Sequence, residues 1–128
     1  MFYLKYLESI RKNEIVKIHN FGKHVRDFTY IRDVVDILQK LQKANIKKNH
    51  DIFNICSNKP ISLMNLISIM NKISKSKART RKVKLQMADV IKTHGDNKKI
   101  LKVVNKKKFY DIKTGIKNTI NWYNTYKF

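Results

Sequence analysis

Residue types that could do chemistry are concentrated in one short run, residues 20–33, with the sequence NFGKHVRDFTYIRD. Gly22 is a turn former, Arg26 and Asp27 carry adjacent opposite charges, and Ile31 begins an apolar helical pattern. A guanidinium offers a planar fork of donors that suits phosphate or carboxylate oxygens, so the run is interpreted as a binding segment. The alternative is an Arg26–Asp27 ion pair that only stabilises a turn, because such pairs are common on protein surfaces.

Charge and composition limit the class of protein. Lys and Arg number 29 against 9 Asp and Glu, a formal net charge of +20, which favours nonspecific contact with nucleic acid or other polyanions. A single cysteine cannot form an internal disulfide, and no apolar run approaches the roughly 18 residues of a membrane span. Lys5 and Glu8 interrupt the first residues, which therefore lack a signal-peptide pattern. We expect one domain, residues 1–128, in the cytoplasm and without a membrane partner.

The remaining reactive side chains predict no metal site. The four histidines have no metal-ligand spacing with Cys56 or with one another, and a zinc site needs several converging ligands. Cys56 is expected to be a small buried residue, and His94 to face solvent on a loop. The lysine clusters at 47–48, 98–99 and 106–108 are expected to be solvated.

The hydrophobic pattern predicts a mixed α/β chain with more helices than strands. Ser62 and Asp111 are expected to begin the third and the last helix, and Gly115 to allow a close neighbour. The polar segments 45–51 and 74–82 are expected to be loops. The expected helices cover residues 3–10, 31–41, 63–73, 100–104 and 111–123, and the expected strands cover residues 16–18, 52–56 and 83–87.

Four segments, in the same order, resemble the C-terminal part of extended short-chain dehydrogenase/reductases of the NAD-dependent epimerase/dehydratase family, above all the UDP-glucuronate 4-epimerases. The first is the glycine turn followed by RDFTYIxD, which looks like that family's segment for the nucleotide-sugar diphosphate. The second and third are FNICSNKPISL, residues 53–63, and QMADVIKTHGD, residues 86–96. The fourth is the last helix, which contains Gly115 and the adjacent residues Trp122 and Tyr123.

The resemblance implies a substrate-binding role for specific residues. Arg26 would reach the diphosphate of a UDP-sugar, and Asp89 would accept hydrogen bonds from ribose or sugar hydroxyls. Phe28 and Gln86 also fall at contact positions of the family. The intact family uses NAD to oxidise and reduce C4 of the sugar, and the cofactor carries that chemistry.

Departures from the family pattern are as informative as the matches. The family's glycine-rich phosphate loop is missing, because the three glycines are far apart, so no NAD site is predicted in this chain. The catalytic Tyr-x-x-x-Lys pair belongs to the missing part, and the same spacing at 123–127 is interpreted as coincidence. Family glycine, proline and glycine are replaced by Cys56, Met87 and Ala88.

The sequence therefore predicts the substrate-binding C-terminal portion of an epimerase, without its dinucleotide-binding Rossmann half, that is inactive alone. A separate chain could supply the missing half. The rival hypothesis is a small basic protein that binds nucleic acid through phosphates, and it is based on the net charge of +20 and the six tyrosines.

Overall fold

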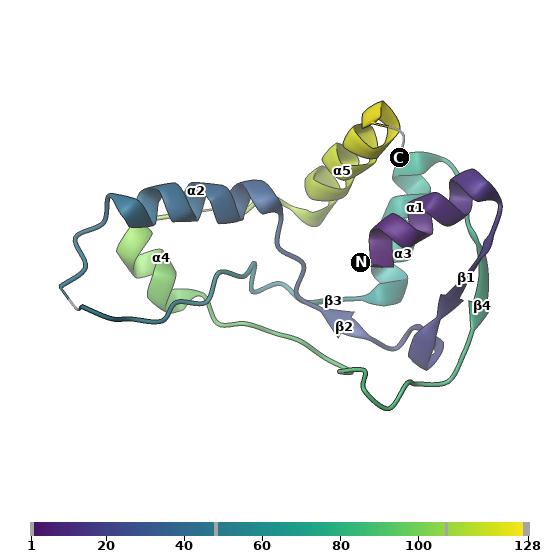
Figure 1. Ribbon diagram of the computed structural model, residues 1–128, viewed down its shortest axis with the longest axis horizontal. Helices are drawn as coiled ribbons and strands as arrows, with labels where there is room; N and C mark the ends of the chain where they lie inside the picture. The colour runs from purple at the N-terminus through teal and green to yellow at the C-terminus, as the bar shows by residue number, and fades with distance from the viewer. Residues whose placement is uncertain (1, 48, 107, 127–128) are drawn as a thin grey trace.

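The computed structural model describes residues 2–47, 49–106 and 108–126, which form helices joined by short strands and long connectors (Figure 1). The mixed α/β class predicted from the sequence is confirmed. The elements, in chain order, are α1 (Phe2–Lys12), β1 (Ile15–Ile18), the short 3₁₀ helix η1 (His19–Gly22), β2 (Val25–Arg26), α2 (Ile31–Gln42), β3 (Ile61–Ser62), α3 (Leu63–Ser74), β4 (Arg79–Lys82), α4 (Lys98–Val104) and α5 (Ile112–Tyr126).

The larger of two hydrophobic clusters lies between α1, β1, α3 and α5. It contains the buried apolar side chains of α3, of which Leu66 and Met70 are completely buried. Ser62 begins α3 as predicted, since its hydroxyl accepts a hydrogen bond from the backbone N–H of Asn65 at 3.2 Å. Asp111 begins α5 in the same way, with its carboxylate accepting from the N–H of Thr114 at 3.0 Å. These two caps fix the starts of the helices that form this core.

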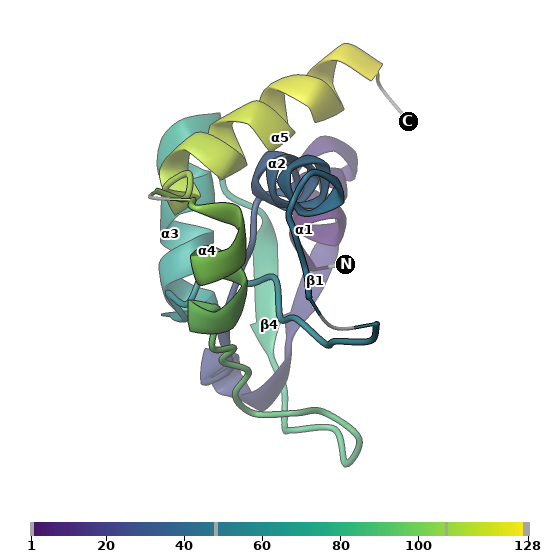
Figure 2. The same cartoon turned by 90° about the vertical axis from the view of Figure 1, so that its left-hand side faces the viewer.

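The smaller cluster lies at the other end of the molecule, between α2 and α4, as Figures 1 and 2 show. Ile37 of α2 and Ile100 of α4 are fully buried against each other's helix. Helix α2 runs from Ile31 as predicted, while Ile31, Val35 and Leu38 of the same helix remain 63%, 44% and 47% exposed. One helix therefore carries two apolar faces, of which this chain covers one.

Two small two-stranded sheets complete the fold. Strand β1 pairs in parallel with β4, and β2 pairs antiparallel with β3, so that Val25 lies opposite Ser62. A single parallel bridge also joins Val25 to Lys92. Strand β2 is thus held on one side by β3 and on the other by the segment that follows residue 90.

The strand predicted at residues 52–56 is wrong. This segment is extended but has no strand as a neighbour among the described residues, and a strand exists only when its backbone groups form a ladder with another strand. Instead, the carbonyl of Cys56 accepts from the side chain of Asn97 at 2.8 Å.

The predicted boundary between a loop at residues 74–82 and a strand at residues 83–87 is also wrong. Strand β4 occupies residues 79–82, inside the predicted loop, whereas residues 83–87 form no strand. All four residues of β4 are exposed, so the segment lacks the apolar alternation that reveals a half-buried strand. The segment is a strand because its backbone pairs with β1. The pairing continues one residue further, where the N–H of Val83 donates to the carbonyl of Ile18 at 2.9 Å.

Candidate functional site

Asp27 is the centre of a hydrogen-bond network that joins three segments. Its carboxylate accepts from the hydroxyl of Ser57 at 2.5 Å and from the backbone N–H groups of Asn58 at 3.0 Å and Gly95 at 3.3 Å. Its own N–H lies 3.3 Å from the hydroxyl oxygen of Thr93. An ionised carboxylate suits this place, since its two oxygens accept several bonds at once. The pair Arg26–Asp27 makes no ion pair in the described structure, so the proposed turn-stabilising pair is wrong.

Arg26 is held against the loop that follows β4. Its Nη1 donates to the carbonyl of Ile91 at 3.1 Å and to that of Val25 at 3.0 Å. The backbone N–H of Val25 donates to the same Ile91 carbonyl at 3.0 Å, and the N–H of Thr93 donates to the Val25 carbonyl at 3.1 Å. These bonds place residues 91–93 beside β2. Nη1 of the guanidinium is engaged in two of them, whereas Nε and Nη2 form no hydrogen bond with the described residues.

Asp89 lies in the same loop, two residues before Ile91. Its Oδ2 is 3.8 Å from Nε2 of His24, which is longer than a hydrogen bond. His24 is 5% exposed, and its Nε2 has no hydrogen-bond partner. The side chain of Gln86 is exposed. Its backbone carbonyl accepts a hydrogen bond from the backbone N–H of Asp89 at 3.0 Å, and this bond closes a turn. The structure therefore brings Asp89 and Gln86 into one turn next to a buried histidine.

Phe28 is only partly accessible. It is half-buried and packs against the larger hydrophobic cluster, two residues after Arg26. Its packing holds the segment after β2 against the core.

Each glycine is packed against a side chain. A Cβ added to Gly22 would lie 2.5 Å from Sδ of Met64, and one added to Gly95 would lie 2.5 Å from Sγ of Cys56. Gly115 allows the close neighbour expected for it, since the ring of Tyr30 lies 3.4 Å from its added Cβ. All three glycines thus lie in close packing with a side chain.

Cys56 is half-buried rather than fully buried. Burial, followed by the negative charge of Asp27, raises the pKa of its thiol, which makes the thiolate rarer and the side chain less reactive. His94 is exposed as expected, with its Nε2 2.5 Å from Oδ1 of Asn58. Neither residue is placed for nucleophilic chemistry.

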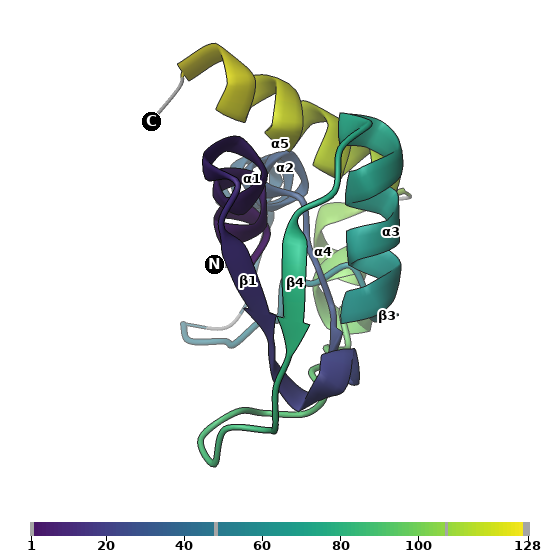
Figure 3. The ribbon, with the colours of Figure 1, turned by 90° about the vertical axis from the view of Figure 1, so that its right-hand side faces the viewer.

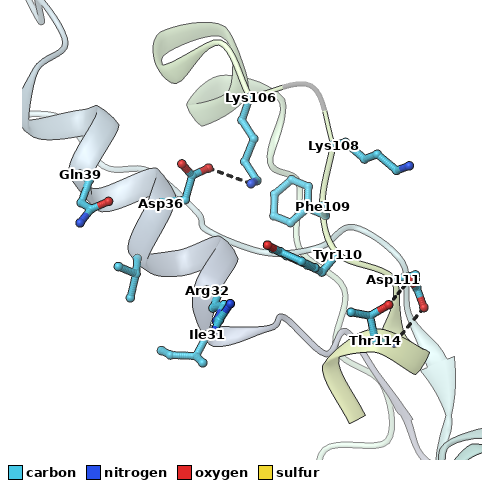
Figure 4. A pocket seen from close by; sticks show the side chains of 11 residues that line it. Ile31, Arg32, Asp36, Gln39, Lys106, Lys108, Phe109, Tyr110, Asp111 and Thr114 are labelled. Atoms are coloured by element: carbon cyan, nitrogen blue, oxygen red, sulfur yellow. Dashed lines mark hydrogen bonds and ion pairs between the residues drawn. The ribbon is translucent and has the colours of Figure 1, made fainter. Parts of the chain in front are cut away.

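A cavity of about 800 Å³ lies elsewhere, between the start of α2 and the segment 108–114 (Figure 4). Ile31 and Val35 of α2 are among its lining residues. Figure 4 shows Tyr110 and Thr114 on the segment that faces the start of α2. None of the four residues predicted to bind substrate lines it. The cavity and the predicted site are thus different surfaces of the molecule.

Lys106 lies at the edge of this cavity and corrects the expectation of a solvated lysine. Its Nζ is 3.0 Å from Oδ1 of Asp33 and 2.8 Å from Oδ2 of Asp36, and only 8% of its side chain is exposed. Burial lowers the pKa of Lys106, but the bonds from Asp36 and Asp33 outweigh it, so the pKa is raised. The pKa of Asp36 is lowered by Lys106 and then by Lys40. Lys107 and Lys48 lie outside the described residues.

The sequence did not predict the network around Asp27 or the burial of Asp33 and His24. Asp33 lies on the same face of α2 as the buried Ile37. A carboxylate on a buried helix face needs a cation or hydrogen-bond donors, so this position could have indicated an ion pair. The four acceptor bonds of Asp27 come from residues 57–59 and 95, which only folding brings near it.

Residues 2–47, 49–106 and 108–126 contain no group of three or more His, Cys, Asp or Glu side chains placed to hold a metal ion. No helix formed by these residues is both long enough and apolar enough to cross a membrane.

Comparison with known proteins gives the family. No protein-family model matches the chain. It is 33% identical over 123 residues to an uncharacterized protein of Methanocaldococcus jannaschii, an alignment that covers 96% of this chain and 37% of the relative. It is 31% identical to the UDP-glucuronate 4-epimerase of Thermodesulfobacterium geofontis, over 95% of this chain and 37% of that enzyme.

A solved structure shows the same fold. The UDP-glucuronic acid 4-epimerase of Bacillus cereus, in complex with UDP-glucuronic acid and NAD, matches 98% of this chain and 40% of its own with a TM-score of 0.86 at 21% identity. The chain thus spans less than half the length of the curated relatives it matches. Nearly all of this chain aligns with such epimerases, and its α/β architecture is that of their C-terminal portion. Its sequence and fold thus match the C-terminal part of extended short-chain dehydrogenase/reductases of the NAD-dependent epimerase family.

Proposed function

We propose that this chain provides the substrate-binding portion of a nucleotide-sugar epimerase and holds a UDP-sugar through Arg26 and Asp89. The observation that carries the proposal is the attachment of the loop to β2 through the Arg26–Ile91 bond, because this bond puts the loop that carries Asp89 next to the guanidinium. Arg26 has donors left over for diphosphate oxygens, and among the described residues the carboxylate of Asp89 has no hydrogen-bond partner that would compete with a sugar hydroxyl.

Gln86 and Phe28 have subsidiary roles in this proposal. Gln86 is exposed in the turn that Asp89 closes, where its amide can meet the nucleoside. Phe28 supports the segment from behind through its packing on the larger core.

The chain is proposed to bind the sugar nucleotide without catalysing its epimerisation. The glycines all serve local packing, so NAD is assigned to another part of the intact fold. Tyr123 is buried in α5 among core residues, which supports the interpretation that the spacing at 123–127 is a coincidence. The purified chain is therefore expected to give no turnover of UDP-glucuronate or UDP-glucose with excess NAD. Measurable turnover would contradict this part of the proposal.

The binding role is tested by titrating UDP into the protein and following amide shifts by NMR. We expect weak binding that Arg26→Ala weakens roughly tenfold or more, because a charge-assisted contact is lost. Arg32→Ala is the matched control, since Arg32 is an exposed arginine on α2 that lines the separate cavity. Asp89→Asn tests the second contact without truncating the loop. Equal affinity of all three variants and the parent for UDP would refute the site.

The missing part of the fold is proposed to cover the exposed face of α2. Ile31, Val35 and Leu38 form an uncovered apolar stripe, and an apolar surface of this kind favours association. The partner is either the rest of the same polypeptide or a separate dinucleotide-binding chain. Val35→Glu is expected to reduce self-association of the isolated chain in sedimentation velocity, while Lys40→Glu on the polar side of α2 is expected to leave it unchanged. Association that does not respond to Val35→Glu would locate the contact elsewhere.

A further inference from the structure

The outward face of the β1–β4 sheet is strongly cationic, and its residues follow from the register. Val16 and Ile18 of β1 are buried in the core, so Ile15 and Lys17 point to the other side. The parallel register places Ile15 beside Arg79 and Lys17 beside Arg81. Arg79 and Arg81 therefore share the outward face with Lys17. Figure 3 shows β1 and β4 side by side, with no helix drawn in front of them.

This face has an unbalanced positive charge. Lys17, Arg79 and Arg81 are exposed and take part in none of the ion pairs recorded for the described residues. The nearest acid in the sequence is the exposed Glu14, which precedes β1. Neighbouring strands lie about 4.8 Å apart, so Lys17 and Arg81 are like charges held side by side, an arrangement that costs stability. An external anion would relieve this repulsion.

The spacing of the cations suits a linear polyanion better than a single phosphate. Residues 75–84 have the sequence KSKARTRKVK, in which lysine or arginine recurs at every second position from 75 to 81. Within β4, positions two apart repeat on one face at about 6.6 Å, which gives a row of charges. We propose that the outward face of β1 and β4 binds the phosphate backbone of single-stranded nucleic acid without sequence preference, a property separate from the UDP-sugar site.

An aromatic side chain lies at the end of this row. Phe21 follows β1 in η1, is 50% exposed, and its N–H donates to the carbonyl of Val83 just beyond β4 at 3.2 Å. Cationic tracks that end in an exposed aromatic ring are typical of single-strand binding, in which rings stack on bases. An anionic membrane is the less favoured partner, because Ile15 is the only apolar side chain among the four strand residues that the register places on this face, which offers little for insertion.

The test is fluorescence anisotropy of a labelled oligodeoxythymidylate of about 20 nucleotides at several salt concentrations, a length longer than one single-strand binding site. We expect the double variant Arg79→Gln/Arg81→Gln to weaken binding roughly tenfold and to reduce the slope of log K against log salt by about 1.4. The matched control Lys98→Gln/Lys102→Gln removes the same charge from exposed positions of α4 and is expected to change Kd less than twofold. Phe21→Ala is expected to weaken binding without changing the salt slope.

Other outcomes would overturn the proposal. Equal losses in the two double variants would mean that only the net charge of the chain matters. Absence of oligonucleotide binding at low salt, or binding only to phosphatidylserine vesicles, would also refute it. UDP titration of the Arg79→Gln/Arg81→Gln protein is expected to match the parent, so failure of this proposal is distinguishable from failure of the UDP-sugar site. Retained secondary structure by circular dichroism controls for unfolding.

Discussion

The Nζ of Lys106 lies 3.0 Å from Oδ1 of Asp33, and the side chains of the two residues are only 8% and 1% exposed. Asp33 also accepts from the backbone N–H of Tyr110 at 3.1 Å, so one buried carboxylate joins α2 to the segment before α5. A buried charge without its partner is costly, which makes this ion pair the connection on which the position of α2 depends.

Lys106→Met is expected to lower the free energy of unfolding by about 3 kcal/mol, because it leaves Asp33 buried without a cation. Urea unfolding followed by circular dichroism measures the loss. Lys102→Met is the control, since Lys102 is exposed on α4 and is expected to matter little. The double variant Asp33→Asn/Lys106→Met is expected to recover part of the stability, because no unpaired charge remains. If Lys106→Met and Lys102→Met had equal effects, the importance of the ion pair would be disproved.

The stability of this ion-pair cluster is expected to depend on pH at both extremes. The folded pKa of Asp36 is lowered from 3.8 by Lys106 and Lys40, so its contribution is present above about pH 4 and is lost as the pH falls through the lower folded value. The folded pKa of Lys106 is raised from 10.5, so its contribution is present below that pH and is lost as the pH rises through the higher folded value. Urea midpoints between pH 2 and 7 are expected to fall less with acid in Lys106→Met than in the parent. Parallel curves for the two proteins would show that Lys106 does not lower the pKa of Asp36.

Elements that carry their own signal were predictable from the sequence. The apolar periodicity of α2 and α5 and the caps Ser62 and Asp111 are local, so the sequence contains them completely. Strand β4 was missed because it has no buried face and depends on a partner more than sixty residues earlier. The strand expected at 52–56 failed for the converse reason, since its pattern is suitable but no described strand pairs with it.

The candidate site divides in the same way. The family resemblance identified Arg26 and Asp89, and the loop of Asp89 does lie beside β2, where Arg26 is. It did not reveal Asp27, whose importance comes from donors near residues 58 and 95 that are distant in sequence. Nor could spacing show that Lys106 is buried, because a cluster of lysines at a helix end usually faces solvent.

Gly22 is expected to tolerate no side chain. Its φ of +84° lies in the left-handed region, where a Cβ costs about 1–2 kcal/mol, and an added Cβ would also meet Met64 at 2.5 Å. Gly22→Ala is therefore expected to lower the free energy of unfolding by at least that amount in urea titrations. Gly115→Ala is the control, because an added Cβ lies 3.4 Å from Tyr30 and alanine favours the helix. A Gly22→Ala protein as stable as Gly115→Ala would contradict the strain argument.

Asp27→Asn is expected to loosen the network that holds the candidate site together. The N–H groups of Asn58 and Gly95 both donate to Oδ2 of Asp27, and the neutral amide oxygen of asparagine is a weaker acceptor than a carboxylate oxygen, so both bonds are expected to weaken. Hydrogen exchange measured by NMR is expected to become faster at these two amides. The amide of Thr93 donates to the backbone carbonyl of Val25 and is expected to keep its protection. Glu14→Gln, which neutralises an exposed acid outside the network, is the matched control. Unchanged exchange at both Asn58 and Gly95 would show that Asp27 does not hold these segments, whereas faster exchange throughout the chain would mean that it supports the whole fold rather than the site alone.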